Sequence, residues 1–252
     1  MTRVTDDRVV SVVKRFFNRP DIASPLERLR RRLPADAQIL IAGGAIRNLI
    51  IEMMHHSAPP TKDIDLFIGG VGADFNLGAA LGDLVTQPTD LGGLRWQPQT
   101  SPYVYDLCVL PNFIIIHTYH LAPTLQGLLD GIDLTFNAII YDYSHRTLHE
   151  NGCLASIRDR IIDFNCPFFP DKCLIAYRLL LMAHKTGFRL SKATFQFLTQ
   201  RLDFETLVPL KRLMQVKQGK PLAKTIMQNF DRLCKYSSYE DYLARPGNRD
   251  RR

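Results

Sequence analysis

Residues 38–70 constrain the fold of this 252-residue chain more than any other stretch. The apolar run Gln38–Ala42 has the length of a strand and ends at Gly43 and Gly44, after which AIRNLIIEMM has helical periodicity. DIDLFI at 63–68 then alternates polar and apolar residues, as a half-buried strand does. The order strand, glycine turn, helix, strand predicts an α/β core.

Two aspartates, Asp63 and Asp65, are separated by one residue on this second strand, so their side chains should project from the same face. Ile64 and Leu66 should then point the other way, into a core. Two carboxylates this close repel each other unless a cation lies between them, and their oxygens suit hard divalent cations such as Mg²⁺. We predict that Asp63 and Asp65 bind metal.

The glycine turn between the two strands has the composition of a phosphate site. Gly43 and Gly44 would let the backbone approach phosphate oxygens closely, and the helix that follows offers free N–H groups and a favourable dipole. Arg47 lies in the first turn of that helix and either pairs with a triphosphate or braces the turn. The alternative is that the glycines form only a tight turn and that Arg47 is a surface residue.

The remaining chain divides into a mixed part and a helical part. A helix in the first 20 residues and a second from Ser24-Pro25 precede the core. A helix near 76–84, a loop at 90–93 and strands at 103–110, 113–119 and 134–141 follow it. Helical periodicity dominates beyond about residue 170, with helices expected at 192–201, 204–215 and 222–234. The last residues, 245–252, are predicted to be disordered and basic.

The charge balance suits a partner that carries phosphate. Lys and Arg number 32 against 25 Asp and Glu, which gives a net charge of +7. The five cysteines lack the spacing of a zinc finger. No apolar run approaches the roughly 20 residues that a membrane span needs, and no signal peptide is apparent, so we expect a cytoplasmic protein with no membrane partner.

Three ordered blocks resemble the CCA-adding enzyme and poly(A) polymerase family of the polymerase-beta nucleotidyltransferase superfamily. ILIAGGAIRNLI followed by KDIDLFI resembles the first signature of that family, with Asn48 where an Asp is usual. IDLTFNAIIYD at 132–142 resembles the second motif, RRDFTINA, with Gly131 and Ile132 in place of the two arginines. The matching residues of this second motif are Asp133, Thr135, Asn137 and Ala138.

The third block, PDKCLIAYRLLLMAHKTGFRL at 170–190, is similar to a helix of the family that reads the base. Arg178, Gly187 and Phe188 match the family pattern. Lys172 stands where an Arg is usual, and Phe168-Phe169 replaces an acidic pair. The resemblance therefore covers about 38–190 and is strongest in the first block.

The resemblance implies an α/β (α+β) nucleotidyltransferase head with a mixed sheet, followed by an all-helical region. The expected parts are N-terminal helices at 1–35, a catalytic domain at 36–165, a helical neck and body at 166–244, and the basic tail. It further implies an NTP substrate, released pyrophosphate and two Mg²⁺ ions, with Mn²⁺ as a possible substitute, held by Asp63 and Asp65. The implied nucleotide-binding residues are Gly43, Gly44, Arg47, Asp133, Asn137, Lys172 and Arg178.

A third carboxylate normally helps to deprotonate the nucleophile in such enzymes. Spacing from the second motif places it near Ile115, which is apolar, whereas Asp106 on the preceding strand is acidic. We favour Asp106 over the alternative that this carboxylate is absent.

The acceptor is left open by the sequence. The leading hypothesis is transfer of a nucleotide to an RNA 3′ end, with tRNA as the first candidate. Transfer to a protein or a small molecule, and binding of nucleotide or RNA by a catalytically impaired relative, are the alternatives. For an RNA acceptor, a basic surface should extend over the helical half, with candidates Lys185, Arg189, Lys192, Arg201, Lys211 and Arg212.

Overall fold

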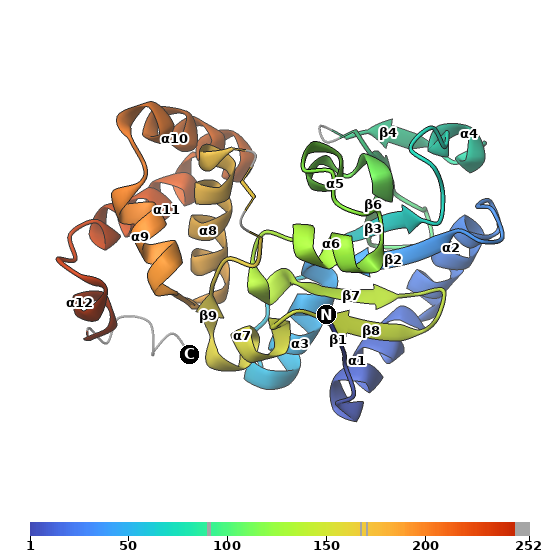
Figure 1. Ribbon diagram of the computed structural model, residues 1–252, viewed down its shortest axis with the longest axis horizontal. Helices are drawn as coiled ribbons and strands as arrows, with labels where there is room; N and C mark the ends of the chain where they lie inside the picture. Colours follow the sequence, from blue (N-terminus) through green and yellow to red (C-terminus); the bar gives the residue numbers. More distant parts are fainter. Residues whose placement is uncertain (90–91, 167, 170, 245–252) are drawn as a thin grey trace.

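The computed structural model describes residues 1–89, 92–166, 168–169 and 171–244, and shows a mixed sheet with helices on both faces beside a group of helices (Figure 1). This arrangement confirms the expected class, a head with a mixed sheet followed by a helical region. None of the helices in the described ranges combines the length and the apolar character needed to cross a bilayer. The predicted disordered tail at 245–252 and part of the predicted 90–93 loop lie outside the described residues.

Within the described residues, the main sheet has eight strands in the order β1-β8-β7-β2-β3-β6-β5-β4. All neighbouring pairs are antiparallel except β3 and β6, which are parallel. The strands are β1 (Thr2–Arg3), β2 (Gln38–Ala42), β3 (Asp63–Gly69), β4 (Thr86–Pro88), β5 (Leu94–Trp96), β6 (Val104–Val109), β7 (Ile139–Asp142) and β8 (Thr147–Glu150). The two strands predicted around the glycine turn, β2 and β3, therefore lie side by side at the centre.

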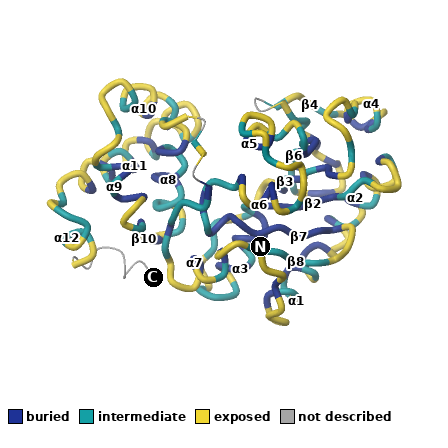
Figure 2. The backbone as a smooth tube through the Cα atoms, viewed as in Figure 1, coloured by how far each residue is buried: buried dark blue, intermediate teal, exposed yellow. Residues whose placement is uncertain are grey.

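Alternation along the central strands separates two cores, one on each face of the sheet. Ile39 and Ile41 of β2 pack into the larger core, whereas Leu40 and Ala42 pack into the smaller one. The larger core is covered by α1 (Asp7–Phe17), α2 (Pro20–Arg30) and α3 (Gly44–His55), and the smaller by α5 (Ile114–Thr118) and α6 (Leu125–Gly131). Both faces of β7 and nearly all of β2 are consequently buried, whereas Asp63, Asp65 and Phe67 on one face of β3 are not fully covered (Figure 2).

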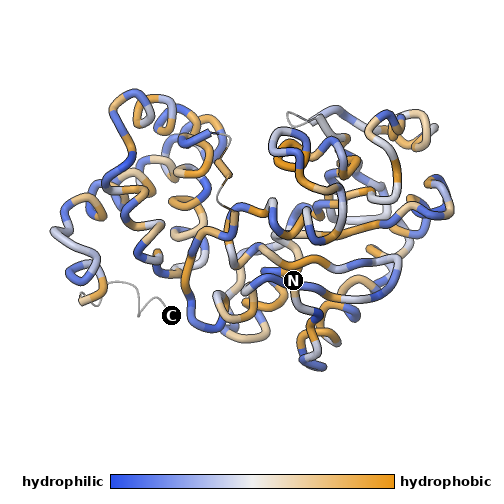
Figure 3. The backbone as a smooth tube through the Cα atoms, in the orientation of Figure 1, coloured by the Kyte–Doolittle hydropathy of each residue, from blue (hydrophilic) through white to orange (hydrophobic). Residues whose placement is uncertain are grey.

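The helical part confirms the periodicity seen in the sequence beyond residue 170. Its helices alternate hydrophobic and hydrophilic segments (Figure 3), because one side of each packs against its neighbours. The helices of this part are α8 (Lys172–Thr186), α9 (Lys192–Gln200), α10 (Phe204–Gln218), α11 (Lys220–Leu233) and α12 (Tyr239–Ala244). Two more helices, α4 (Leu77–Leu81) and α7 (Cys153–Asp159), belong to the part that contains the sheet. A parallel pair of short strands, β9 (Ile161–Ile162) and β10 (Arg189–Leu190), joins the helical part to the end of the part that contains the sheet.

The predicted strand at 113–119 is wrong, because this segment forms the short helix α5. The isoleucines favour a strand locally. However, a 3-10 turn at Leu110–Asn112 ends β6 and redirects the chain, and Ile115 and Ile116 are both buried beside α6. Two successive buried residues suit a helix better than a strand that is covered on one side.

Two other boundaries also differ from the sequence prediction. The second helix begins at Pro20, which takes the first helical position, so that Pro25 lies inside α2 and is buried. The predicted strand at 134–141 starts with a 3-10 turn at Thr135–Asn137, and the ladder begins only at Ile139.

Candidate active site

A cleft of about 1140 Å³ lies between the sheet and α8, and it gathers nearly all the residues proposed from the sequence. These are Gly43, Gly44, Arg47, Asp63, Asp65, Asp106, Asp133, Asn137 and Arg178. They come from segments far apart in the chain, which the fold brings to one place.

The carboxylates project into the cleft from two adjacent parallel strands. Ile64 and Leu66 are buried in the larger core, so Asp63 and Asp65 share the opposite face of β3, as predicted. Asp65 is the register partner of Asp106 on β6, which places a third carboxylate beside the pair. Between Ile115 and Asp106, the two positions considered for a third carboxylate, the acidic one therefore lies beside Asp63 and Asp65.

Negative charge at Asp63 and Asp65 is only partly offset by the nearby arginines Arg178, Arg47 and Arg95. Burial raises the pKa of Asp65 to about 6, and the nearby charges of Asp106 and Asp63 act in the same direction against the opposing charge of Arg178. Among the described residues, neither Asp63 nor Asp65 makes an ion pair through its side chain. A divalent cation would relieve this repulsion, and the oxygen donors are of the type that Mg²⁺ prefers.

The fit to a metal rests on these two aspartates. Across the described residues, no group of three or more His, Cys, Asp or Glu side chains is gathered closely enough to hold a metal ion. Asp106 is engaged by Arg95 of β5, whose Nε and Nη2 donate to its two carboxylate oxygens at 2.7 and 2.6 Å. Sequence reasoning missed Arg95, because its partner lies on another strand.

The glycine turn lies directly against Asp65. Gly43 precedes α3 with φ +73° and ψ −129°, a conformation that L side chains rarely adopt. A Cβ at Gly43 would lie 3.3 Å from Oδ2 of Asp65. The N-terminus of α3, with its free N–H groups, is therefore adjacent to the carboxylates.

Arg47 connects the start of α3 to the second motif. Its side chain is buried, and its Nε and Nη2 donate to Oδ1 of Asn48 at 3.0 and 2.9 Å, while Nη1 donates to Oδ1 of Asn137 at 2.5 Å. The guanidinium also lies over the ring of Phe136, 5.2 Å from its centroid. Burial and the charge of Arg178 lower the pKa of Arg47 to about 10, so it stays charged at neutral pH.

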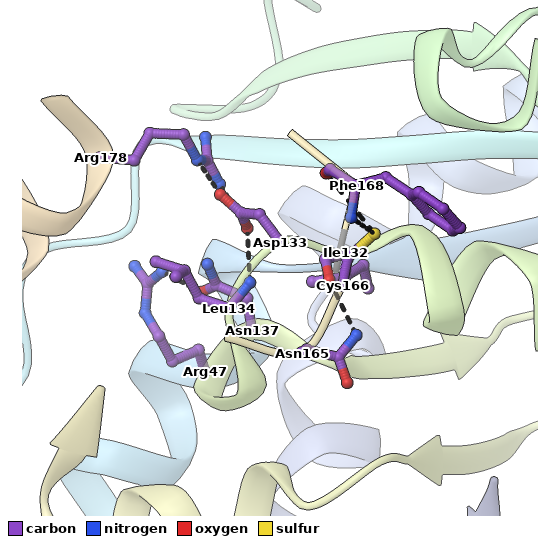
Figure 4. A network of polar contacts seen from close by, with 9 residues as sticks. All are labelled: Arg47, Ile132, Asp133, Leu134, Asn137, Asn165, Cys166, Phe168 and Arg178. Atoms are coloured by element: carbon purple, nitrogen blue, oxygen red, sulfur yellow. Dashed lines mark hydrogen bonds and ion pairs between the residues drawn. The ribbon is translucent and has the colours of Figure 1, made fainter. Parts of the chain in front are cut away.

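An ion pair connects α8 to the sheet side of the cleft (Figure 4). Nε and Nη2 of Arg178 donate to the two carboxylate oxygens of Asp133, and Oδ1 also accepts from the backbone N–H of Leu134. The charge of Asp133 raises the pKa of Arg178. Two residues that the resemblance assigns to nucleotide binding thus hold each other in place.

Lys172 is the one proposed residue that the structure does not bring to the cleft. The side of α8 that faces the cleft carries Leu174, Ile175, Arg178, Met182 and Lys185, at the spacing of one helix face. Lys172 lies outside this face, and its charge acts on Asp203 beside α10. Lys172 and Arg178 therefore lie on different sides of α8.

Two lysines of the cleft were not among the predicted nucleotide-binding residues, although Lys185 was a candidate for the basic surface. Lys62 precedes Asp63, and Lys185 lies two turns after Arg178 on the same face of α8. Burial lowers the pKa of Lys185, as do the positive charges of Arg47 and Lys62, whereas Asp63 raises it. Lys185 thus stands close to the carboxylates, and its helical spacing from Arg178 was the signal that could have found it.

The wall of the cleft near the start of α8 is apolar. Ile114, Phe168 and Leu174 are unusually exposed for large apolar residues, at 39%, 37% and 38%. The rings of Phe168 and Tyr119 stack with centroids 4.5 Å apart. Such a surface offers contact to a planar group, but few hydrogen bonds.

Solved structures with a similar fold are nucleotidyltransferases. A CCA-adding enzyme in complex with ATP matches at a TM-score of 0.62 with 16% identity, covering 92% of this chain and 55% of that one. The Thermotoga maritima CCA-adding enzyme complexed with tRNA matches at 0.59 with 17% identity, over 87% and 54% of the two chains. A tRNA nucleotidyltransferase with a primer tRNA and an ATP analogue matches at 0.55 with 17% identity, over 82% and 60%.

These likenesses establish a shared fold with the CCA-adding enzymes. The chain spans little more than half the length of the proteins that it matches. No protein-family model matches the sequence, and no curated protein matches it.

Proposed function

We propose that this chain is a metal-dependent nucleotidyltransferase that transfers a nucleotide from an NTP to the 3′ end of an RNA, with tRNA as the first candidate. The observation that carries the proposal is that Asp63 and Asp65 line a cleft beside the glycine turn and the N-terminus of α3. The fold shared with CCA-adding enzymes supports it.

The donor side of the reaction is assigned to the sheet side of the cleft. Asp63 and Asp65 would hold Mg²⁺, which supplies positive charge to the triphosphate and to the leaving pyrophosphate when bound. The N–H groups at the start of α3 donate to phosphate oxygens, which Gly43 allows to come close. Lys62 and Lys185 add positive charge across the cleft, and both suit a triphosphate.

The acceptor hydroxyl must lose a proton during transfer, and Asp106 is the proposed base. It neighbours Asp65 in register and lines the same cleft. General-base action requires a carboxylate within hydrogen-bonding reach of the hydroxyl. Arg95 takes one acceptor site on each oxygen of Asp106, so the hydroxyl must use a remaining site or displace Arg95.

We also propose that the chain works as a catalytic part at 36–165 with a helical part at 166–244, since the cleft lies where these meet. The Asp133–Arg178 pair joins the two parts. A cytoplasmic location remains a prediction of the sequence.

The test is to incubate the protein with each labelled NTP, Mg²⁺ and either total RNA or tRNA that lacks its 3′-terminal nucleotides. We expect labelled tRNA, and we expect Asp65→Asn to abolish the labelling. Asp231→Asn, at an exposed position of α11, is the matched control and should retain it. Labelling that survives Asp65→Asn would contradict the proposal.

A second acceptor class is favoured by the apolar wall of the cleft. Phe168 belongs to the pair that replaces acidic residues of the family that the chain resembles, and Ile114 and Leu174 are exposed apolar residues of the same cleft. A protein or small-molecule acceptor would need the same donor chemistry. Transfer of label to protein rather than RNA in a cell extract, lost in Asp65→Asn, would establish this alternative.

A further inference from the structure

Arg95 extends the row of charged residues across the sheet. It stands opposite Asp106 in the antiparallel pairing of β5 with β6, and Asp106 stands beside Asp65 in the parallel pairing of β6 with β3. The backbone of Arg95 is thus one strand further from β3, which carries Asp63 and Asp65, than that of Asp106. The backbone fixes this order, independently of side-chain rotamers.

Close backbone packing holds β5 in place. A Cβ at Gly93, just before β5, would lie 2.4 Å from the carbonyl oxygen of Leu107 on β6, so only glycine permits this approach. The N–H of Gly93 donates to Oγ1 of Thr89 at 3.0 Å. Arg95 is therefore presented to Asp106 by a constrained strand.

The contact is a fork of two parallel hydrogen bonds, and it uses both carboxylate oxygens. Nε donates to Oδ1 at 2.7 Å and Nη2 to Oδ2 at 2.6 Å. The charge of Arg95 also interacts favourably with Asp63 and Asp65. Arg95 therefore supplies to the three carboxylates the positive charge that a metal ion would supply.

The same pair is open to solvent and can be displaced. The side chains of Arg95 and Asp106 are 50% and 25% exposed. Exposed ion pairs shift an equilibrium by only about two- to fivefold. A divalent cation held by Asp63 and Asp65 can compete with Arg95 for Asp106 when the contact has this strength.

We propose that Arg95 is a positioning residue, an internal counterion that holds Asp106 back from the metal pair and so sets the metal concentration at which the site fills. The inference rests on the proposed metal site at Asp63 and Asp65. Metal binding releases Asp106 from Arg95, and the freed carboxylate becomes available to the cation and to the acceptor hydroxyl.

The test measures Mn²⁺ affinity of the full chain directly, from the electron paramagnetic resonance signal of free Mn²⁺. Arg95→Ala should bind Mn²⁺ about tenfold more tightly, because a nearby positive charge and a competing bond are both removed. Arg95→Lys keeps the charge and loses the fork, so its gain should be about threefold or less. Arg158→Ala, which removes an exposed arginine paired with Asp159, should leave the affinity unchanged.

A double-mutant cycle separates a specific contact from a general effect of charge. In a protein that already carries Asp106→Asn, Arg95→Ala should change the logarithm of the Mn²⁺ affinity by at most half as much as it does in the wild type. The reason is that Arg95 has lost the carboxylate that it contacts. A full gain in that background, or no gain in Arg95→Ala alone, would overturn the inference.

Asp63→Asn distinguishes this failure from failure of the proposed function. If Asp63→Asn abolishes Mn²⁺ binding while Arg95→Ala changes nothing, the metal site stands and the role of Arg95 falls. If Asp63→Asn binds Mn²⁺ as the wild type does, the metal site itself is misassigned and both proposals fall.

Discussion

Replacing each glycine of the turn by alanine should give opposite results, although the two residues are adjacent and identical in the sequence. Gly43 has φ +73° and ψ −129°, outside the regions open to L side chains, whereas Gly44 is the first residue of α3 and has no positive φ. A Cβ at position 43 would press on Oδ2 of Asp65 at 3.3 Å, and one at position 44 would meet Nη2 of Arg47 at an ordinary 3.6 Å.

The expected magnitudes follow from these conformations. Gly43→Ala should lower the free energy of unfolding by about 1–3 kcal/mol, the usual cost of a strained backbone. Gly44→Ala should leave it unchanged or raise it by up to about 1 kcal/mol, since alanine is the better helix former. Gly43→Ala should also weaken binding of an NTP, because the added methyl displaces Asp65 and occupies space next to the phosphate cradle.

Urea denaturation of the two variants and the wild type measures the first effect from the shift in midpoint at constant slope. Titration with a fluorescent NTP in the presence of Mg²⁺ measures the second. Equal stability and equal affinity of Gly43→Ala and Gly44→Ala would refute the assignment of the turn, because only one of the two positions is strained.

Three further predictions concern charge. In EDTA, the free energy of unfolding of the wild type relative to Asp65→Asn should fall by about 1–3 kcal/mol between pH 4 and pH 6. The reason is that the pKa of Asp65 rises from 3.8 to about 6 on folding, so that in this range the folded state keeps the proton and the unfolded state loses it. Urea titrations across this range measure the difference, and parallel curves for the two proteins would contradict the prediction. Arg178→Lys should lose the forked contact with Asp133, reduce stability by about 1 kcal/mol and weaken NTP binding several-fold, whereas unchanged binding would remove this pair from the site. RNA affinity should fall with salt at a log–log slope of roughly −0.7 per phosphate contact, and a flat response would exclude an RNA acceptor.

The centre of the site was predictable because its signals are local. Alternation alone places Asp63 and Asp65 on one face, and the glycine turn requires only the strand before it and the helix after it. The position of Asp106 beside Asp65 depends on the pairing of β3 with β6, which the sequence does not state. Its acidic character was nevertheless enough to select it over Ile115.

Other parts of the site depend on long-range geometry and were not accessible from local patterns. Arg95 lies on a strand of three residues, too short for a periodic signal, and its partner is set by strand pairing. Lys172 and Lys185 lie on the same helix as Arg178, but only the side of α8 that meets the sheet decides which of them reaches the cleft. Helical spacing from Arg178 gives that side only once Arg178 itself is placed in the cleft.

Polar contacts connect the segments that form the candidate site. Arg47 and Asn137 join the glycine turn to the second motif, and Asp133 with Arg178 joins that motif to α8. Asn48 accepts two bonds from Arg47 in a position where the family that this chain resembles has Asp. These polar contacts lie around the glycine turn and the second motif, whereas the wall near the start of α8 is apolar. In the proposed enzyme, donor chemistry and base selection would therefore depend on different residues, and comparing the four NTPs would measure base selection.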